Sequence, residues 1–237
     1  MIILLMTKVL KKMKLNNKVV LITGAGGGIG QAAVRKFVSE GASVMLADIG
    51  TDVTQLLVDE LGTEHCACVA VDVSQADQVE NMVSTCVERF GGIDVFVANA
   101  GIEGTIGEII NTDVSNLDTV LAVNVRGVWL GLHYVIPVMR DGGGGSIMIT
   151  SSGAGVKGSP NTACYSTSKH AVIGLMRCAA LECAQYAIRV NTVNPGAVDT
   201  RMIASIEKGF ADSGVDDFKG MVEATTPLGR YGQPDEI

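Results

Sequence analysis

Aromatic and charged residues are scarce in this chain of 237 residues. Aromatic side chains make up 4% and charged side chains 18%, whereas 47% of the residues are hydrophobic. This balance excludes a disordered chain and supplies a core large enough for an α/β domain. Basic residues are also fewer than acidic ones: the chain has 18 Lys and Arg against 25 Asp and Glu, which gives a net charge of -7. Nucleic-acid-binding proteins usually carry excess positive charge, so we expect no nucleic-acid partner.

Metal-ligand patterns are missing too. The six cysteines include no CxxC pair, and the three histidines lack zinc-type spacing. We therefore expect no metal. The cysteines are interpreted as reduced core residues of a cytoplasmic protein.

Long hydrophobic runs are absent from the N-terminal stretch. The apolar run at 2–6 is too short to span a bilayer, and the order of a signal peptide is lacking. Residues 1–17 are predicted to be a disordered extension or the result of a start codon placed too early. A membrane-surface helix is the alternative, because lysines alternate with apolar residues there. We expect no membrane partner.

Apolar strand-like runs alternate with helical segments from residue 18 onward. Strands are predicted at 18–23, 42–47, 66–71, 93–98, 146–150 and 188–193. Helices are predicted from the glycine turn to about residue 40, then at 51–61, 75–90, 113 to about 139, and 161–186. This alternation is typical of a parallel sheet with helices on both faces. We predict an α/β fold of the Rossmann type, doubly wound in three layers, with one domain at 18–237.

A glycine-rich turn separates the first predicted strand from the first predicted helix. It reads Thr23-Gly24-Ala25-Gly26-Gly27-Gly28-Ile29-Gly30. Glycines there allow backbone amides to approach a pyrophosphate, and the helix N-terminus attracts the same anion. No Gly-Lys-Ser/Thr follows, so a P-loop is excluded.

Asp48 ends the second predicted strand, about twenty residues beyond this turn. A carboxylate at that place accepts hydrogen bonds from the adenosine ribose and repels a 2′-phosphate. No Lys or Arg occurs in the turn, so NAD is predicted over NADP. A helix N-cap is the alternative role for Asp48.

Tyr165 and Lys169 are four residues apart on a predicted helix, 13 residues after Ser152. Side chains at this spacing share one helix face. A nearby ammonium favours the phenolate of a tyrosine, which then accepts or donates the proton of an alcohol. Tyr-x-x-x-Lys alone is common on ordinary helices, so the neighbouring motifs decide.

Together these residues resemble the short-chain dehydrogenase/reductase family in its short, single-domain, NAD-dependent branch. The resemblance runs from about Lys18 to the last residue. Its motifs, in chain order, match Thr23, Gly24, Gly28, Ile29 and Gly30, then Asn99-Ala100-Gly101, Asn124, Ser152, Tyr165 with Lys169, and Asn194-Pro195-Gly196 with Thr200.

The resemblance implies a role for each matched residue. Tyr165 is expected to be the general acid/base and, with Ser152, to bind substrate. Lys169 is expected to lower the pKa of Tyr165 and to bind the nicotinamide ribose. Asn124 is expected to hold a water that links Lys169 to solvent, or merely to bridge backbone. The remaining expected cofactor contacts are Asp72 and Val73 at the adenine, and Val198 and Thr200 at the carboxamide, beside Asn99, Ala100, Gly101, Pro195 and Gly196.

Two departures from the family pattern are visible. Ala98 stands where a first asparagine is common. The family's last helix and strand have no counterpart after residue 237, so an uncovered apolar edge on the sixth strand is expected. A homo-oligomer (dimer or tetramer) is expected for the family, in which that segment often supplies subunit contacts.

The expected activity is oxidoreduction of a small secondary alcohol or ketone. The loop at about 197–230 is apolar enough to suggest an apolar pocket. A 3-oxoacyl thioester reductase and a non-catalytic dinucleotide-binding scaffold are alternatives. Ser151 is an alternative to Ser152, although the spacing to Tyr165 favours Ser152.

Overall fold

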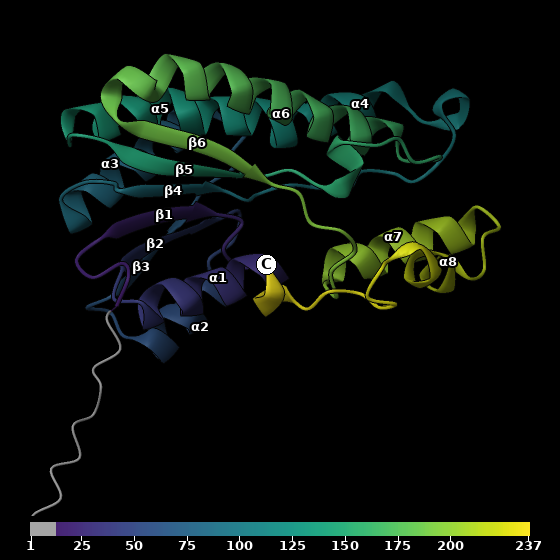
Figure 1. Ribbon diagram of the computed structural model, residues 1–237, viewed down its shortest axis with the longest axis horizontal. Coiled ribbons are helices and arrows are strands. Elements are labelled where there is room, and N and C mark those ends of the chain that lie inside the picture. The colour runs from purple at the N-terminus through teal and green to yellow at the C-terminus, as the bar shows by residue number, and fades with distance from the viewer. Residues whose placement is uncertain (1–12) are drawn as a thin grey trace, which may run out of the picture.

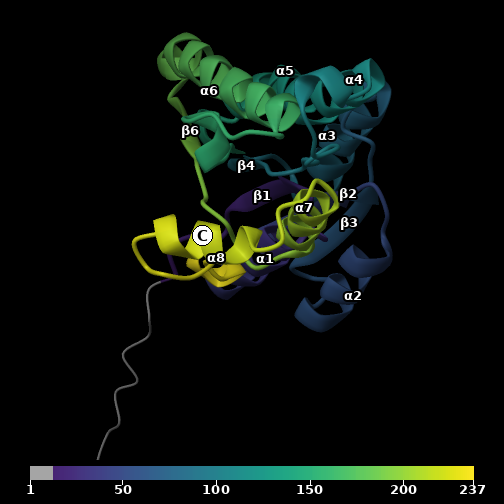
Figure 2. The same ribbon diagram turned by 90° about the vertical axis from the view of Figure 1, so that its right-hand side faces the viewer.

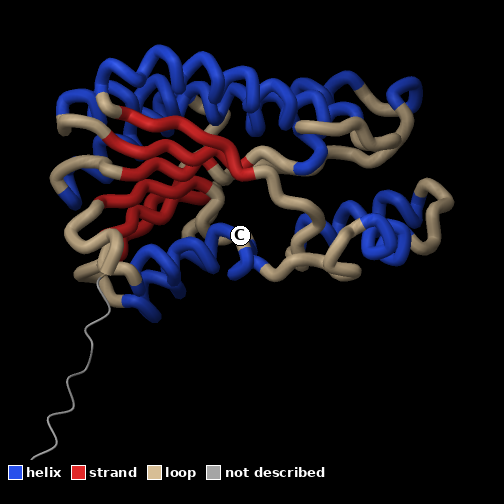
Figure 3. The backbone as a smooth tube through the Cα atoms, in the orientation of Figure 1, coloured by secondary structure: helices blue, strands red, loops and turns tan. Residues whose placement is uncertain are grey.

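The computed structural model describes residues 13–237, which contain one sheet of six parallel strands (Figure 1, Figure 3). The strand order is β3-β2-β1-β4-β5-β6. The strands are β1 (Val19–Thr23), β2 (Ser43–Asp48), β3 (Cys66–Ala70), β4 (Val95–Ala98), β5 (Gly145–Thr150) and β6 (Ile188–Val193). The order reverses between β1 and β4, and ligands of open α/β sheets bind at the carboxyl ends of strands beside such a reversal. The predicted Rossmann-type fold is confirmed.

Helices cover the two faces of the sheet separately, as the two perpendicular views show (Figures 1 and 2). One face is packed by α1 (Gly28–Ser39) and α2 (Asp52–Leu61), whose Val34 and Leu57 join the core with Ile22 of β1. The other face is packed by α3 (Ala76–Phe90), α5 (Gly127–Asp141) and α6 (Ala163–Cys183). Burial between two helix layers explains why β1 is apolar at both faces and buried throughout.

The predicted helix from 113 to about 139 is interrupted in the structure. It consists of α4 (Val114–Leu121), a π-helical turn at Ala122–Arg126, and α5. Such turns often occur at functional sites. The whole stretch is long and apolar enough to cross a membrane by composition, but it supplies core side chains such as Val128, Val135 and Met139. It is a core helix here.

The edge strand β6 differs from its expected apolar character. Ile188 and Val190 are buried, and β6 packs against α6. Arg189 and Asn191, on the opposite face, are exposed. Alternating side chains therefore leave polar groups on the open face, which is one way that proteins blunt a sheet edge.

Residues 13–17 were predicted to belong to a disordered N-terminal extension, but they take part in the fold. Residues 13–17 form turns that pack on the end of α1. The Leu15 amide donates to the Glu40 carbonyl at 3.0 Å, and the Lys14 amide donates to the Glu40 carboxylate at 3.2 Å. The disorder predicted for 1–12 lies outside the described residues.

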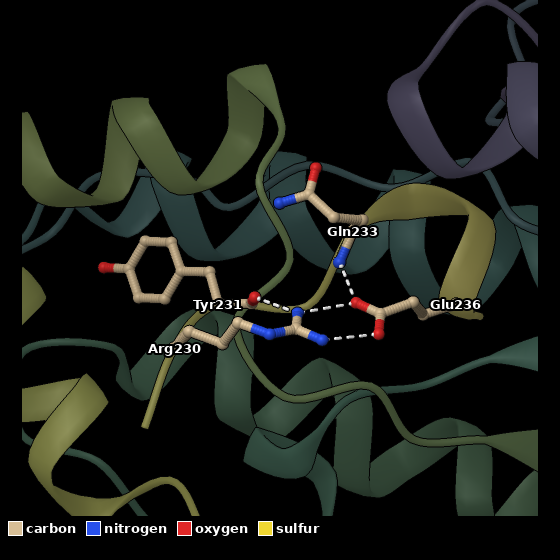
Figure 4. Close-up of polar contacts among 4 residues, drawn as sticks. All are labelled: Arg230, Tyr231, Gln233 and Glu236. Carbon is tan, nitrogen blue, oxygen red and sulfur yellow. Dashed lines mark hydrogen bonds and ion pairs between the residues drawn. The ribbon is translucent and has the colours of Figure 1, made fainter. Parts of the chain in front are cut away.

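The expected substrate loop contains two helices, α7 (Arg201–Asp212) and α8 (Phe218–Thr225), which project from the sheet (Figure 1). Its two stems are tied together, because Val198 bridges Gly232 and the Asp199 amide donates to the Gly232 carbonyl at 2.8 Å. Next to the second stem, Arg230 and Glu236 form an ion pair through two hydrogen bonds, both 2.7 Å long (Figure 4). The loop therefore starts and ends at one fixed point.

Candidate active site

The glycine turn connects β1 to the uncapped N-terminus of α1. Gly24 has φ +65°, and a Cβ there would lie 2.8 Å from the Cα of Ala100. Glycine is therefore required both by backbone conformation and by the close approach of the segment after β4. Gly27 occupies the N-cap of α1 without a side-chain hydrogen bond. The first amides of α1, from Gly28 and Ile29 onward, are available to an anion.

Asn99 holds this turn against the neighbouring strands. Its amide nitrogen Nδ2 donates to the Gly24 carbonyl at 3.0 Å, and its Oδ1 accepts from the Thr150 hydroxyl at 3.2 Å. The backbone amides of Asn99 and Ala100 both donate to Oγ1 of Thr23, at 3.1 and 3.2 Å. The predicted Asn99-Ala100-Gly101 element thus joins the glycine turn to β5.

Asp48 points back to the glycine turn from the end of β2. Its Oδ2 accepts from the Gly26 amide at 2.8 Å, and its Oδ1 accepts from the Ile49 amide at 2.8 Å. The helix that follows begins after Thr51, so the alternative N-cap role is not the one observed. A carboxylate fixed beside the turn is where an adenosine ribose is bound in folds of this type.

Lys169 and Asn124 meet beside Gly101. A Cβ on Gly101 would lie 3.3 Å from both Nζ of Lys169 and Oδ1 of Asn124. Lys169 is 4% exposed, and its Nζ donates to the Thr150 carbonyl at 2.9 Å. Burial lowers the pKa of Lys169 to about 8, so the ammonium form still predominates at pH 7.

The Asn124 amide is largely committed to backbone bridging. Its Oδ1 accepts from the Ile102 amide at 2.8 Å, and its Nδ2 donates to the Ile102 carbonyl and to Oγ of Ser168, both at 2.9 Å. Both amide protons are thus used, and only one lone pair of Oδ1 is left for a water. The Asn124 side chain bridges backbone in this structure, and its predicted water-holding role stays a prediction.

The choice between the two serines follows from where their side chains lie. Ser151 is 2% exposed, and its hydroxyl donates to the Lys169 carbonyl at 2.9 Å inside the fold. Ser152 is partly exposed, its Oγ accepts from the Ala154 amide at 3.1 Å, and its interaction with Tyr165 lowers the pKa of the phenol. Ser152 is therefore the serine beside Tyr165, as its spacing predicts.

Tyr165 and Lys169 lie together on α6, with Nζ 5.5 Å from the centroid of the phenol ring. Burial raises the pKa of Tyr165, the hydrogen bond with Ser152 lowers it, and the charge of Glu103 raises it. The net direction is upward, so the lowering expected from Lys169 is not found in the chain alone. Desolvation of the phenolate outweighs the stabilising contacts.

The residues expected at the adenine are separate from this group. The Asp72 carboxylate accepts from the amide and hydroxyl of Ser74, at 2.9 and 2.7 Å, and these bonds lower its pKa. Val73 is 8% exposed and belongs to the core. Its side chain is therefore used for packing, and its backbone is the part left for a ligand.

The segment after β6 returns to both parts of the site. The Pro195 carbonyl accepts from the Gly153 amide at 2.7 Å, next to Ser152. Gly196 has open space at its Cβ position. Thr200 packs directly on the glycine turn, since a Cβ on Gly28 would lie 2.7 Å from its Cγ2. The hydroxyl of Thr200 donates to the Val198 carbonyl at 3.1 Å.

Comparison with known families agrees with this geometry. The model of the short chain dehydrogenase family matches residues 18–210. The chain belongs to this family. Two relatives, levodione reductase of Leifsonia aquatica and cyclohexanol dehydrogenase of Acinetobacter sp. (strain SE19), are 36% and 37% identical. Each alignment covers 94% of this chain and about 85% of the relative.

Solved structures of other short-chain dehydrogenases have the same fold. A levodione reductase structure matches with a TM-score of 0.89 at 35% identity, covering 94% of this chain and 88% of that one. NAD⁺-bound xylitol dehydrogenase matches at 0.87 and 32% identity, covering 94% and 90%. This chain is thus an oxidoreductase of the family whose relatives include alcohol dehydrogenases and ketone reductases.

Two parts of this short-chain dehydrogenase site were not predicted. The π-helical turn at Ala122–Arg126, which carries Asn124, leaves no signal in the apolar pattern. Glu103 follows Gly101 in a segment without periodicity, yet its side chain is only 11% exposed and its charge acts on Tyr165. A charged residue two positions beyond a family motif was the available signal.

Proposed function

We propose that this chain is an NAD-dependent oxidoreductase that interconverts a secondary alcohol and a ketone, with Tyr165 as the general acid/base. One observation carries the proposal. Tyr165 interacts with Ser152, and Nζ of the buried Lys169 lies 5.5 Å from the centroid of its ring, at the edge of the sheet that carries the glycine turn. The composition and the family further predict a cytoplasmic homo-oligomer.

In the oxidation direction, Tyr165 accepts the proton of the alcohol and Ser152 holds the same oxygen by a hydrogen bond. NAD, when bound, accepts the hydride from the alcohol carbon. The Lys169 ammonium would bind ribose hydroxyls and favour the phenolate, although burial outweighs this effect in the chain alone. Asn124 keeps the 101–102 backbone against Lys169. In the reduction direction, Tyr165 returns the proton to the ketone oxygen.

The residues present fit a dinucleotide. The uncapped start of α1 and Gly24, Gly28, Ile29 and Gly30 would hold the pyrophosphate. Asp48 would bind the adenosine ribose, and its charge favours NAD over NADP. Asn99, Ala100, Gly101, Pro195, Gly196, Val198 and Thr200 would surround the nicotinamide half, and Asp72 and Val73 the adenine.

Oxidation of cyclohexanol with NAD⁺ or NADP⁺ tests the proposal. The substrate is chosen because a 37% identical relative is named cyclohexanol dehydrogenase. A higher kcat/KM with NAD⁺ than with NADP⁺ is expected. Asp48→Ala should reduce the ratio of the two values by about tenfold or more, since it removes the carboxylate that repels the 2′-phosphate of NADP⁺. Equal use of both cofactors by the unaltered chain would contradict the Asp48 argument. Light scattering on the same sample would give the oligomeric state.

A 3-oxoacyl thioester reductase is kept as a second candidate because of one comparison. A 3-ketoacyl-(acyl-carrier-protein) reductase from Brucella melitensis complexed with NADH matches with a TM-score of 0.85 at 30% identity. That alignment covers 93% of this chain and 87% of the reductase. Asp48 therefore does not count against this candidate. NADH-dependent reduction of an acetoacetyl thioester, with no oxidation of cyclic or linear secondary alcohols, would favour it.

The two adjacent serines give a matched pair of variants. Ser152→Ala is expected to lower kcat by about 10²-fold or more with little change in melting temperature, because it removes a donor to the substrate oxygen. Ser151→Ala is expected to lower the melting temperature instead, because it removes a buried hydrogen bond to the Lys169 carbonyl. Steady-state kinetics and calorimetry on both variants separate the roles. The reverse pattern would reassign the catalytic serine.

A further inference from the structure

Both ends of the substrate loop rest on Gly28, the first residue of α1. A Cβ on Gly28 would lie 2.7 Å from Cγ2 of Thr200, in the first stem of the loop (197–200). It would also lie 3.7 Å from Cγ of Pro234, directly after the second stem (230–233). The amides at this end of α1 are the ones available to a pyrophosphate. The substrate loop is therefore anchored on the expected phosphate site.

The two stems are joined to each other through their backbones. They run parallel, with a bridge between Val198 and Gly232. The Asp199 amide donates to the Gly232 carbonyl at 2.8 Å, and the Gly232 amide donates to the Ala197 carbonyl at 2.9 Å. A displacement of the second stem therefore moves the first stem as well, together with Thr200.

The turn at the second stem is closed by the ion pair of Arg230 and Glu236 (Figure 4). Nη1 and Nη2 of Arg230 donate to the two carboxylate oxygens of Glu236, both at 2.7 Å, and Nη1 also donates to the Tyr231 carbonyl at 2.8 Å. Oε2 of Glu236 accepts from the Gln233 amide at 2.7 Å as well. Pro234 lies inside the turn that these bonds close, and the turn packs against α1.

This ion pair is charged over the whole pH range of an enzyme assay. The hydrogen bonds from Arg230, followed by that from the Gln233 amide, lower the pKa of Glu236 to about 2. Both side chains are nevertheless about half exposed, at 48% for Arg230 and 41% for Glu236. Exposed ion pairs add little to global stability. Its loss is therefore expected to change the placement of the stems while the chain still folds.

We propose that Arg230 and Glu236 are positioning residues for the dinucleotide. By closing the turn around Pro234, they hold both stems of the substrate loop on Gly28, in the arrangement that the bound dinucleotide requires. The inference rests on the proposed function of the glycine turn. A ligand that binds one arrangement loses affinity in proportion to the fraction of chains that leave it. The ion pair thus acts on the cofactor through the stems, without touching it.

Calorimetric titration of NADH tests the proposal without turnover. Glu236→Gln keeps the size of the side chain and removes its charge, so the dissociation constant of NADH should rise about fivefold, the upper end for an exposed ion pair. Arg230→Gln should have the same effect. The double variant should be no weaker than either single one, because the two side chains act as one pair. In alcohol oxidation, the KM for NAD⁺ should rise by the same factor while kcat changes little.

Arg35 of α1 and Glu60 of α2 form the matched control pair. They too are joined by two hydrogen bonds, at 2.9 and 2.7 Å, and both side chains are about half exposed. Glu60→Gln should leave the affinity for NADH unchanged, because this pair does not hold the stems. An equal loss of affinity in Glu60→Gln and Glu236→Gln would overturn the proposal, since it would reflect a general loosening of α1.

Amide hydrogen exchange in the chain without NADH checks the step through the stems. The amides of Asp199 and Gly232 should exchange faster in Glu236→Gln than in the unaltered chain, and those of α2 should not. Faster exchange without a change in affinity would make the pair purely structural and overturn the proposal. If Glu236→Gln does not fold, Arg230→Gln gives the same comparison.

The same titrations separate this inference from the proposed function. Absence of NADH binding by the unaltered chain would refute the proposed function, and this inference with it. NADH binding by the unaltered chain, with the same affinity in Glu236→Gln and Arg230→Gln, would refute the inference alone.

Discussion

Tyr165→Phe is expected to lower kcat for alcohol oxidation by about 10³-fold or more, within the range of general acid/base groups. The substitution removes one oxygen and leaves the ring that packs beside Lys169. Hydride transfer then proceeds without a group to take the alcohol proton. In the proposed mechanism Tyr165 and Ser152 both hydrogen-bond the substrate oxygen, so the substitution removes one of its two partners.

The measurement must separate lost chemistry from lost binding. Thermal denaturation with increasing NADH should give the same stabilisation for Tyr165→Phe as for the unaltered chain, because a ligand that binds only the folded state raises its melting temperature. Tyr134→Phe is a suitable control, since Tyr134 packs against the core at α5, away from the site. Retained turnover in Tyr165→Phe would assign the activity to another group and leave the dinucleotide-binding scaffold as the better explanation.

The strands and the motif positions were predictable because local chemistry decides them. Continuous apolar runs gave β1 and β2 within one residue, as expected for strands buried between helix layers. The start of β4 was predicted two residues early, at Ile93. Asp94 comes before β4 because its carboxylate accepts from the Val19 amide and from Nζ of Lys18, at 2.9 and 2.6 Å. A cross-strand bond of that kind leaves no periodic pattern.

The protonation behaviour of the candidate site was harder to predict than the residues that lie in it. Helix geometry put Tyr165 and Lys169 on one face, because residues i and i+4 are neighbours there, and the family resemblance added Ser152. The direction of the Tyr165 pKa was wrong for the chain alone, since burial depends on how much of the fold surrounds the phenol. The ion pair between Glu103 and Arg201 of α7 joins residues nearly one hundred positions apart. Such effects come from tertiary packing and are absent from any short window.

Gly30→Ala is expected to destabilise the chain severely, although alanine is the better helix former. Gly30 is the third residue of α1, and a Cβ there would overlap the Gly24 carbonyl and lie 2.8 Å from the Cα of Ala25. Both contacts are backbone atoms, so no side chain can turn away to make room. Alanine gains up to about 1 kcal/mol over glycine within a helix. The overlap costs about 3 kcal/mol or more, at the upper end of overpacking, and therefore dominates.

Gly27→Ala is the matched control within the same turn. Gly27 has φ −73°, and its Cβ would lie 3.4 Å from the same Gly24 carbonyl, an ordinary contact. Calorimetry should show a melting temperature lowered by roughly 5 °C or more in Gly30→Ala and by little in Gly27→Ala. NADH should stabilise the second variant and not the first, because moving α1 away from Gly24 separates the two halves of the phosphate site. Equal melting temperatures for the two variants would mean that the turn relaxes freely, and that close packing of α1 on the turn is not what requires glycine at residue 30.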